Sequence, residues 1–319
     1  MPLAGLYRLL AGAAALPWRL GLRRPWRAPC PVVVVGNLIV GGAGKTPTVI
    51  ALVQALRRAG HRPGVVSRGH GRRSHGGLLV TAASSAAEVG DEPWLIARAT
   101  GAPVAVDTRR PQAALALLRA HPDLTVLVAD DGLQHHALAL DLALWVFDER
   151  GAGNGALLPA GPLRQPLPGR VPADARVLYN AAAPSTALPG ALAQRQLAGA
   201  VPLAAWHAGQ AMDAAALTAL QGRTLLAIAG IASPERFFGM LRDRGLQIHT
   251  MALPDHADLR EPPWPAGTPD VLCTEKDAAK LDPARCGATR VWVVGLDFQL
   301  PPDLIADICQ TLARAGPQR

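Results

Sequence analysis

The sequence predicts an α/β fold, in which a parallel sheet carries helices on both faces and a smaller α/β unit follows. The first observation is that short apolar runs alternate with helical patterns, the order that produces parallel sheets. The second is that these runs are rich in β-branched residues, as expected of strands buried on both faces. The third is a stretch poor in charge and rich in Ala, Pro and Gly, from Thr186 to Gly209. We therefore predict one domain at residues 1–200 and a smaller C-terminal domain at residues 201–319.

The predicted strands are spaced so that helices fit between them. The first strand, Pro31 to Gly36, precedes a Gly-rich turn and a helical pattern that ends at Gly60. The segment from Asn154 to Pro172 is rich in Gly and Pro and is long for a plain connection, so we expect a working loop there. Further strands are predicted at Pro63–Ser67, Leu124–Ala129, Leu142–Phe147 and Arg176–Tyr179, and in the smaller unit at Leu225–Ala229, Val271–Cys273 and Val291–Val294.

The composition is that of a globular protein with a basic surface. Half of the 319 residues are apolar, and the formal net charge is +8. Such a surface suits nucleic acid, anionic lipid or phosphorylated substrates. Because no basic stripe is interleaved with aromatic residues, we expect no nucleic-acid partner. The four cysteines form no CxxC pair and no cluster with metal-ligand spacing, so we expect free thiols in a reducing compartment.

Lysine is rare enough in this chain to be informative. Its basic residues are almost all arginines, and the three lysines are Lys45, Lys276 and Lys280. All three lie in segments that resemble motifs. The segment Thr274 to Asp277 follows a predicted strand, but Glu275 stands where the base-reading motif [NT]KxD of GTPases has its lysine. Guanine specificity is therefore not supported.

The N-terminus predicts a short apolar helix at a membrane surface. The uncharged run from Leu9 to Trp18 is too short to span a bilayer, and arginines follow it directly. An apolar helix flanked by tryptophans and arginines suits an anionic membrane face. A signal-peptide core and an ordinary packed helix are the alternatives. The helical spacing is set by Leu3, Leu6, Tyr7, Leu10 and Ala14.

A phosphate-binding loop lies between the first strand and its helix. Gly41 to Thr46 reads GGAGKT, in the strand–turn–helix context that a P-loop requires. We expect the backbone N–H groups of Gly41, Gly42, Ala43 and Gly44 to surround phosphate oxygens. Lys45 would reach the outer phosphates of ATP, and the Thr46 hydroxyl would bind Mg²⁺. Two positions depart from known patterns, since Ile39 replaces the first glycine and Val40 replaces the extra lysine of partitioning ATPases.

A second metal-binding element follows the strand Leu124 to Ala129. Asp130, Asp131 and Gly132 come directly after it. Ligands of open parallel sheets bind at the carboxyl ends of the strands, so these carboxylates are candidate Mg²⁺ ligands. A polar turn that only caps the strand is the alternative.

The candidates for acid–base chemistry are isolated in the sequence. Asp91 lies in the segment VGDEP just before a helical pattern, where it would serve as a general base or as a helix cap. His256 lies in a polar turn of the second half, where a lone histidine is more often structural. Arg68 and Arg72 follow the second strand and are candidates for phosphate contact.

Eight ordered segments resemble the tetraacyldisaccharide 4′-kinases, the lipid A 4′-kinases of Gram-negative bacteria. The likeness covers nearly the whole chain, and eight segments in order are more specific than any one of them. The segments are Val35–Pro47, Ser67–Arg72, Val89–Pro93, Asp130–His135, Gly153–Arg164, Gly230–Phe238, Pro254–His256 and Thr274–Leu281.

The resemblance implies transfer of the ATP γ-phosphate to the 4′-hydroxyl of tetraacyldisaccharide 1-phosphate, giving lipid IVA. It implies a P-loop domain with a smaller C-terminal domain closing over the nucleotide. It further implies a Mg²⁺-dependent enzyme on the cytoplasmic face of the inner membrane. We expect a monomer. By motif, Lys45 and Thr46 match the residues that hold phosphates and metal. Asp91 matches the catalytic base and His256 its partner, and the group near the metal is matched by Asp130, Asp131 and Gln134.

Three positions depart from the family pattern. His70 stands where the family usually has tyrosine, Leu133 replaces a usual phenylalanine, and Ala257 replaces a common second histidine. Two other classes of function stay open at this point. One is a P-loop transferase or ATPase acting on a soluble metabolite, and the other is a nucleotide-switched binding protein that transfers nothing.

Overall fold

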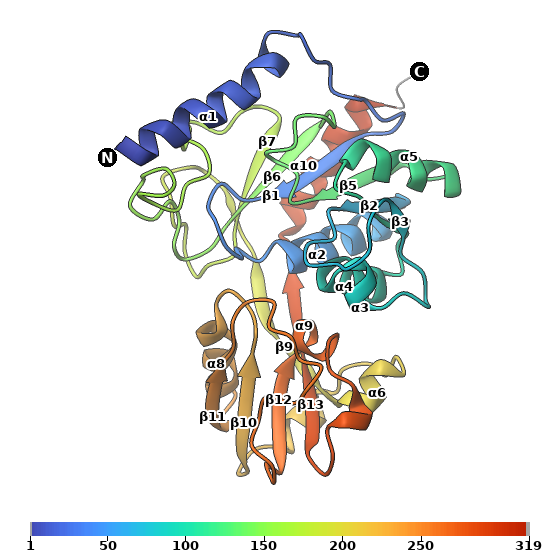
Figure 1. Cartoon of the computed structure of the whole chain (residues 1–319), viewed down its shortest axis with the longest axis vertical. Helices are drawn as coiled ribbons and strands as arrows, with labels where there is room; N and C mark the ends of the chain where they lie inside the picture. Colours follow the sequence, from blue (N-terminus) through green and yellow to red (C-terminus); the bar gives the residue numbers. More distant parts are fainter. Residues whose placement is uncertain (1, 317–319) are drawn as a thin grey trace.

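The protein contains two sheets, one beyond the other along its longest axis (Figure 1). The computed structural model describes residues 2–316. Within these residues the larger sheet has eight strands in the order β3-β4-β2-β5-β1-β6-β7-β8, and all pairs are parallel except β3 with β4. The strands are β1 (Val32–Gly36), β2 (Pro63–Ser67), β3 (Leu78–Leu79), β4 (Val104–Val106), β5 (Val126–Asp130), β6 (Leu142–Phe147), β7 (Ala175–Tyr179) and β8 (Ala191–Leu192).

Helices cover both faces of this sheet because its central strands are apolar on both sides. Val33 and Val35 of β1 face a core shared with α2 (Lys45–Arg58), α4 (Asp91–Thr100) and α10 (Pro302–Ala315). Val32 and Val34 face the opposite core, with Leu117 of α5 (Arg110–Ala120). This alternation is the two-sided burial that the β-branched run predicts.

The smaller sheet has five strands in the order β11-β10-β12-β13-β9, and only β9 with β13 is antiparallel. One face is covered by α7 (Ala214–Thr218) and α8 (Pro234–Asp243), and the other by α6 (Leu203–His207) and α9 (Glu275–Ala278). The strands are β9 (Gln194–Pro202), β10 (Thr224–Ala229), β11 (Gln247–Ala252), β12 (Asp270–Thr274) and β13 (Arg290–Gln299). The predicted fold class, a parallel sheet flanked by helices with a smaller α/β unit, is confirmed.

The chain passes between the two sheets twice. Residue 200, near which the sequence predicts a domain boundary, lies inside β9. After β13 the chain returns to the larger sheet, where Leu304 and Ile308 of α10 are buried in its core. The division into domains at residue 200 stays a prediction. In the structure the chain enters the smaller sheet at β9 and returns to the larger unit after β13.

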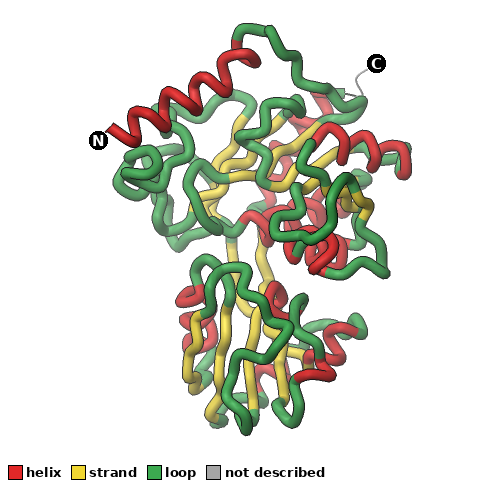
Figure 2. The backbone as a smooth tube through the Cα atoms, in the orientation of Figure 1, coloured by secondary structure: helices red, strands yellow, loops and turns green. Residues whose placement is uncertain are grey.

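The N-terminal helix α1 (Pro2–Arg19) lies along the outside of the larger unit, on the side away from the smaller sheet (Figure 1). The Tyr7 hydroxyl donates a hydrogen bond of 2.9 Å to the carbonyl of Arg164, in the connection between β6 and β7. That connection, which contains the predicted working loop, is loop throughout (Figure 2). No helix within residues 2–316 has the length and apolar character needed to cross a bilayer.

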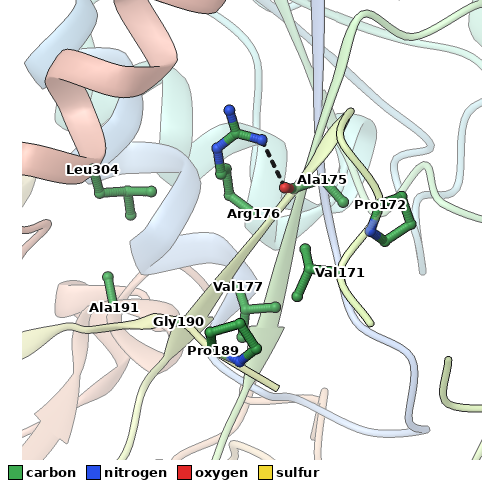
Figure 3. A pocket seen from close by; sticks show the side chains of 9 residues that line it. All are labelled: Val171, Pro172, Ala175, Arg176, Val177, Pro189, Gly190, Ala191 and Leu304. Carbon is green, nitrogen blue, oxygen red and sulfur yellow. Dashed lines mark hydrogen bonds between the residues drawn. The ribbon is translucent and has the colours of Figure 1, made fainter. Parts of the chain in front are cut away.

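One hollow of about 310 Å³ lies beside the first residues of β7, next to α10 (Figure 3). Its polar wall is Arg176, which donates 2.8 Å to the carbonyl of Ala175 and pairs with Asp307 of α10. Because ligands of parallel sheets bind at the carboxyl ends of the strands, a hollow at the start of β7 is on the wrong edge for a nucleotide.

Candidate active site

The phosphate loop joins β1 to α2 in the conformation that its glycines permit. Gly41 and Gly44 have φ values of 87° and 89°, which residues with a Cβ rarely adopt. Asn37 donates 2.9 Å to the carbonyl of Gly41 and so ties the start of the turn to its middle. Gly42 and Ala43 lie between these points, and the amide of Asn180 donates 3.1 Å to the Ala43 carbonyl. The loop is therefore held from the carboxyl ends of two strands, β1 and β7.

Lys45 points from the first turn of α2 toward the end of β5. Its ammonium lies 3.2 Å from Asn37 Oδ1 and 3.6 Å from Asp131 Oδ2. Thr46 is the next residue of α2 and is half-buried. The structure thus brings the phosphate loop and the second metal-binding element together, as the sequence predicts.

Asp130 ends β5 as a fully buried carboxyl group. Ser67 at the end of β2 donates 3.0 Å to its Oδ2, whereas Oδ1 is buried with no hydrogen-bond partner in residues 2–316. Burial, with smaller contributions from Glu92 and Asp131, raises the pKa of Asp130 to about 7. A cation at Oδ1 would reverse this shift, because it favours the ionised form.

The residues after β5 are fixed by two arginines. The buried Arg110 donates to the carbonyls of Asp130 (2.9 Å) and Asp131 (3.1 Å). Arg164, from the loop between β6 and β7, lies 3.4 Å from both Asp131 Oδ1 and Gln134 Oε1. The loop that the sequence marks as unusual therefore reaches the predicted metal group. Asp131 has a φ of 49°, a strained value that only His256 shares among the described non-glycine residues.

These side chains fit Mg²⁺ bound together with a nucleotide. Mg²⁺ in such sites takes one or two carboxylates and completes its shell with phosphate oxygens and water. Within residues 2–316 Asp130 supplies a buried oxygen without a hydrogen-bond partner, Asp131 pairs with Lys45, and Thr46 follows Lys45 in α2. Within the described chain no group of three or more His, Cys, Asp and Glu residues would hold a metal alone. Mg²⁺ binding at this site would therefore depend on phosphate oxygens of the nucleotide as further ligands.

Asp91 and His256 meet although 165 positions separate them in sequence. Asp91 is the first residue of α4 in the larger unit, and His256 lies in the turn after β11 in the smaller one. His256 Nδ1 is 3.0 Å from Asp91 Oδ2, and Asp91 Oδ1 accepts 3.0 Å from the N–H of Glu92. The N-cap residue of α4 is Gly90 and not Asp91. The alternative in which Asp91 only caps the helix is therefore not supported.

The surroundings of Asp91 keep it in the form that can accept a proton. Burial raises the pKa of Asp91, but the hydrogen bond from His256 and the charge of Lys276 outweigh burial and hold the pKa below its usual value. The hydrogen bond to Asp91 raises the pKa of His256, partly opposed by burial. At neutral pH Asp91 is therefore a carboxylate, ready to accept a proton.

The three departures from the family pattern have different surroundings. His70 lies edge-on to the His256 ring, with 5.3 Å between the ring centroids. Leu133 packs against Gly36, where a Cβ would come within 2.5 Å of it. Ala257 is near Gly230 in the smaller unit. Of the three, His70 is the one with a ring contact to the dyad formed by Asp91 and His256.

The part that several residues play in the site could not be predicted from the motifs. Asn37 and Glu92 lie in the segments Val35–Pro47 and Val89–Pro93 but have no predicted role there, and Asn180 lies in none of the eight segments. Asn37 and Asn180 directly follow β1 and β7. The rule that ligands collect at the carboxyl ends of parallel strands is the signal that would have found these two asparagines. Arg110 has no such signal, because its position depends on how α5 packs. Arg164 ends the segment Gly153–Arg164, but its contacts with Asp131 and Gln134 depend on how the long loop folds.

Comparison with known proteins identifies the family. The family model described as Tetraacyldisaccharide-1-P 4′-kinase matches residues 1–313. The chain belongs to this family. A tetraacyldisaccharide 4′-kinase of Methylibium petroleiphilum is 54% identical over 323 residues, covering 100% of this chain and 90% of the relative. The enzyme of that name from Leptothrix cholodnii is 51% identical over 322 residues, with coverages of 99% and 92%.

A solved structure extends the likeness to the fold. LpxK from Aquifex aeolicus, crystallised in complex with ATP, matches with a TM-score of 0.77 at 26% identity, covering 98% of both chains. The predicted family, the P-loop kinase fold and the assignment as an ATP-dependent kinase are thereby confirmed. As a tetraacyldisaccharide 4′-kinase family member, the chain is a transferase rather than a nucleotide-switched binding protein.

Gly44→Ala should weaken ATP binding. The added Cβ would lie 2.1 Å from Asn180 Nδ2, so either the loop or the Asn180 anchor must move. We expect the Kd for ATP, measured by calorimetry, to rise about tenfold or more, equivalent to about 1.4 kcal/mol. Gly60→Ala is the matched control, since Gly60 has a φ of 88° with nothing near it. It should lower the free energy of unfolding by about 1 kcal/mol and leave the Kd unchanged. Equal ATP affinity in both variants would contradict this account of the loop.

Asp91→Asn should lower the pKa of His256 as read by NMR titration of its ring protons. The folded pKa lies above the ordinary 6.5, so the pair's stabilisation is complete below pH 6.5 and is lost as pH rises through the folded value. On the acid side the lowered pKa of Asp91 keeps this contribution until pH falls below 3.8. Asp258→Asn, which removes an exposed carboxylate two residues from His256, should leave its titration unaltered. A His256 pKa indifferent to Asp91 would refute the pairing.

Proposed function

We propose that this kinase transfers the γ-phosphate of ATP to the 4′-hydroxyl of a tetraacyldisaccharide 1-phosphate, giving lipid IVA for lipid A synthesis. Asp91 is the base for the acceptor hydroxyl, and His256 holds it in position. The observation that carries the proposal is the contact between Asp91 and His256 across the two units, next to the phosphate site. The substrate is inferred from the name of the relatives, tetraacyldisaccharide 4′-kinase.

The dyad and the phosphate site are parts of one electrostatic region. Glu92, the neighbour of Asp91, raises the pKa of Asp130, and Lys45 lowers it. Lys45 in turn pairs with Asp131. Asp91 is therefore adjacent in the chain to a residue whose charge reaches the group that would hold the phosphates.

The reaction needs positioning and charge neutralisation more than covalent chemistry. Gly41, Gly42, Ala43 and Gly44 offer backbone donors to the triphosphate, and Lys45 neutralises its outer end. Mg²⁺, which we propose is held by Thr46, Asp130 and Asp131 with Gln134 beside them, supplies further positive charge to the phosphates when bound.

Asp91 then completes the chemistry. Its carboxylate accepts the proton of the 4′-hydroxyl as the acceptor oxygen bonds to the γ-phosphorus. The bond from that phosphorus to the bridging oxygen of ADP breaks, and ADP leaves with the electron pair. His256 donates to the other face of the carboxylate and stabilises its charge before the transfer.

The loop after β2 provides positive charge for an anionic acceptor. A hollow of about 360 Å³ is lined by Arg68, His70, Arg72, His75 and Thr108, among others. His70 links this hollow to His256. Arginines beside the base suit a substrate that carries a phosphate of its own.

The proposed acceptor is a lipid, and α1 has an exposed apolar surface that suits contact with a membrane. The exposed side chains of α1 include Leu3, Leu6, Leu9, Leu10 and Leu16, each at least half exposed. Arg23 and Arg24 follow the helix and are also exposed. An apolar face next to arginines binds anionic bilayers at the surface. We propose peripheral attachment to the cytoplasmic face of the inner membrane, with one copy of the chain as the working unit, since one chain supplies every residue of the site.

The assay is direct transfer from radiolabelled ATP and Mg²⁺ to detergent-dispersed tetraacyldisaccharide 1-phosphate, read as a doubly phosphorylated lipid. Asp91→Ala should reduce kcat by about 10²–10⁴ and leave ATP affinity near normal. Lys45→Ala should reduce both kcat and ATP affinity, since it removes the cation from the phosphates. Wild-type turnover in Asp91→Ala would remove this residue from the mechanism, and no labelled lipid with the wild type would refute the function.

Replacing leucines on α1 should detach the protein from membranes. Leu6→Glu with Leu10→Glu puts two charges on the apolar face, so co-flotation with phosphatidylglycerol vesicles should fall at least tenfold. Leu192→Glu is the control, because Leu192 is an exposed leucine of β8, the edge strand of the larger sheet, and not of α1. Unchanged flotation of the α1 variant would show that this helix does not contact the bilayer.

A further inference from the structure

Lys276 lies between the two units, and the mechanism above gives it no part. It is the second residue of α9, in the smaller unit, and its side chain is 15% exposed. Its ammonium contacts three groups: Glu92 Oε1 at 3.3 Å, Asp255 Oδ1 at 3.2 Å and His256 Nε2 at 3.3 Å. Glu92 belongs to α4 of the larger unit, so this one cation contacts both units beside the dyad.

The contact with His256 decides which ring nitrogen carries the hydrogen. An ammonium group has donors only, so Nε2 facing Lys276 must accept. The remaining nitrogen, Nδ1, then carries the hydrogen and donates it to Asp91 Oδ2. Lys276 thus selects the tautomer that the dyad needs.

The surroundings keep Lys276 charged. Burial lowers its pKa, but Glu92, Asp91 and Asp255 outweigh burial and raise it. Without this cation, Glu92 and Asp255 would lie near each other and near Asp91 uncompensated. Such a change would disturb the acceptor site as well as the histidine.

We propose that Lys276 is a positioning residue for phosphoryl transfer, which holds His256 in the tautomer that donates to Asp91 and fixes α4 to the turn of residues 254–257. The proposal rests on the roles of Asp91 and His256 given above. A compact ammonium with three separate acceptors suits this place better than the flat fork of arginine, in a chain where arginine is the usual cation.

The charges around Asp91 and His256 predict how removing Lys276 alters the pH dependence of kcat. Facing Asp91 and His256 are the cations of Lys276 and Lys280, the carboxylates of Glu92 and Asp255, and the ring of His70. Lys276 lowers the pKa of both members of the dyad. Loss of this cation should therefore raise both pKa values and move to higher pH the acidic limb of the kcat profile, which within pH 5 to 9 is set by protonation of His256.

The experiment uses the full chain, radiolabelled ATP, Mg²⁺ and tetraacyldisaccharide 1-phosphate, with kcat measured from pH 5 to 9. Lys276→Met should reduce kcat at neutral pH by about 10- to 100-fold, leave KM for ATP within about twofold, and move the acidic limb upward. Lys276→Arg keeps the charge but not the geometry, so its kcat should fall while the limb stays in place. Arg285→Met is the matched control, since it removes a cation of the smaller unit from an exposed ion pair with Glu261.

The ¹⁵N shifts of His256 give a readout that needs no substrate. They should report hydrogen at Nδ1 in the wild type and a mixture of tautomers in Lys276→Met. This result stands even if the lipid is not phosphorylated, so failure of the proposal and failure of the function are distinct outcomes.

Three results would overturn the proposal. They are wild-type kcat and acidic limb in Lys276→Met, an unchanged His256 tautomer, and a loss of kcat that follows a lowered unfolding temperature with the limb in place. If Lys276→Met does not fold, Lys276→Arg decides, because wild-type kcat in that variant would also overturn it.

Discussion

The hydrogen bond between His256 and Asp91 is the contact on which the rest of the proposed site depends, because it joins the two units beside the candidate base. The phosphate loop, Lys45 and the aspartates after β5 all belong to the larger unit and would bind a nucleotide without the smaller one. Only the smaller unit supplies the partner of the base. In the proposed mechanism the larger unit binds ATP and supplies the base, and the smaller unit supplies the histidine that holds the base in position.

The parallel sheet explains why so many polar side chains gather in one place. Asn37, Ser67, Asp130 and Asn180 each stand at or just after the carboxyl end of a strand, and the register places these ends along one edge. The apolar strands supply rigidity, since their side chains are buried on both faces. The polar residues at the edge supply the chemistry, and the buried Asp130 carries the electrostatic cost that a bound cation relieves.

Uniform apolar runs made the large parallel sheet predictable. The prediction for Leu142–Phe147 coincides with β6, and that for Pro31–Gly36 differs from β1 by one residue. β4 was missed because three residues give no pattern, and β11 because an edge strand with exposed polar residues has no continuous apolar run. The phosphate loop and the carboxylates of β5 were predictable from local context. The pairing of Asp91 with His256 was available only through family likeness, and the contacts of Lys276 depend on packing between units that no local pattern encodes.

The antiparallel pair of β9 and β13 has a mechanical consequence. Both crossings between the units run through this ribbon, whose far end is anchored by Arg195 on Asn180 and by Phe298 in the larger core. A single linker would let the smaller unit rotate freely about the chain. A two-stranded ribbon resists twisting and bends most easily perpendicular to the plane of its strands. Its register shifts beside Gly295, which lies opposite Gly199. A bend at that pair of glycines would swing His256 along one arc, so that each excursion returns the imidazole to the same carboxylate.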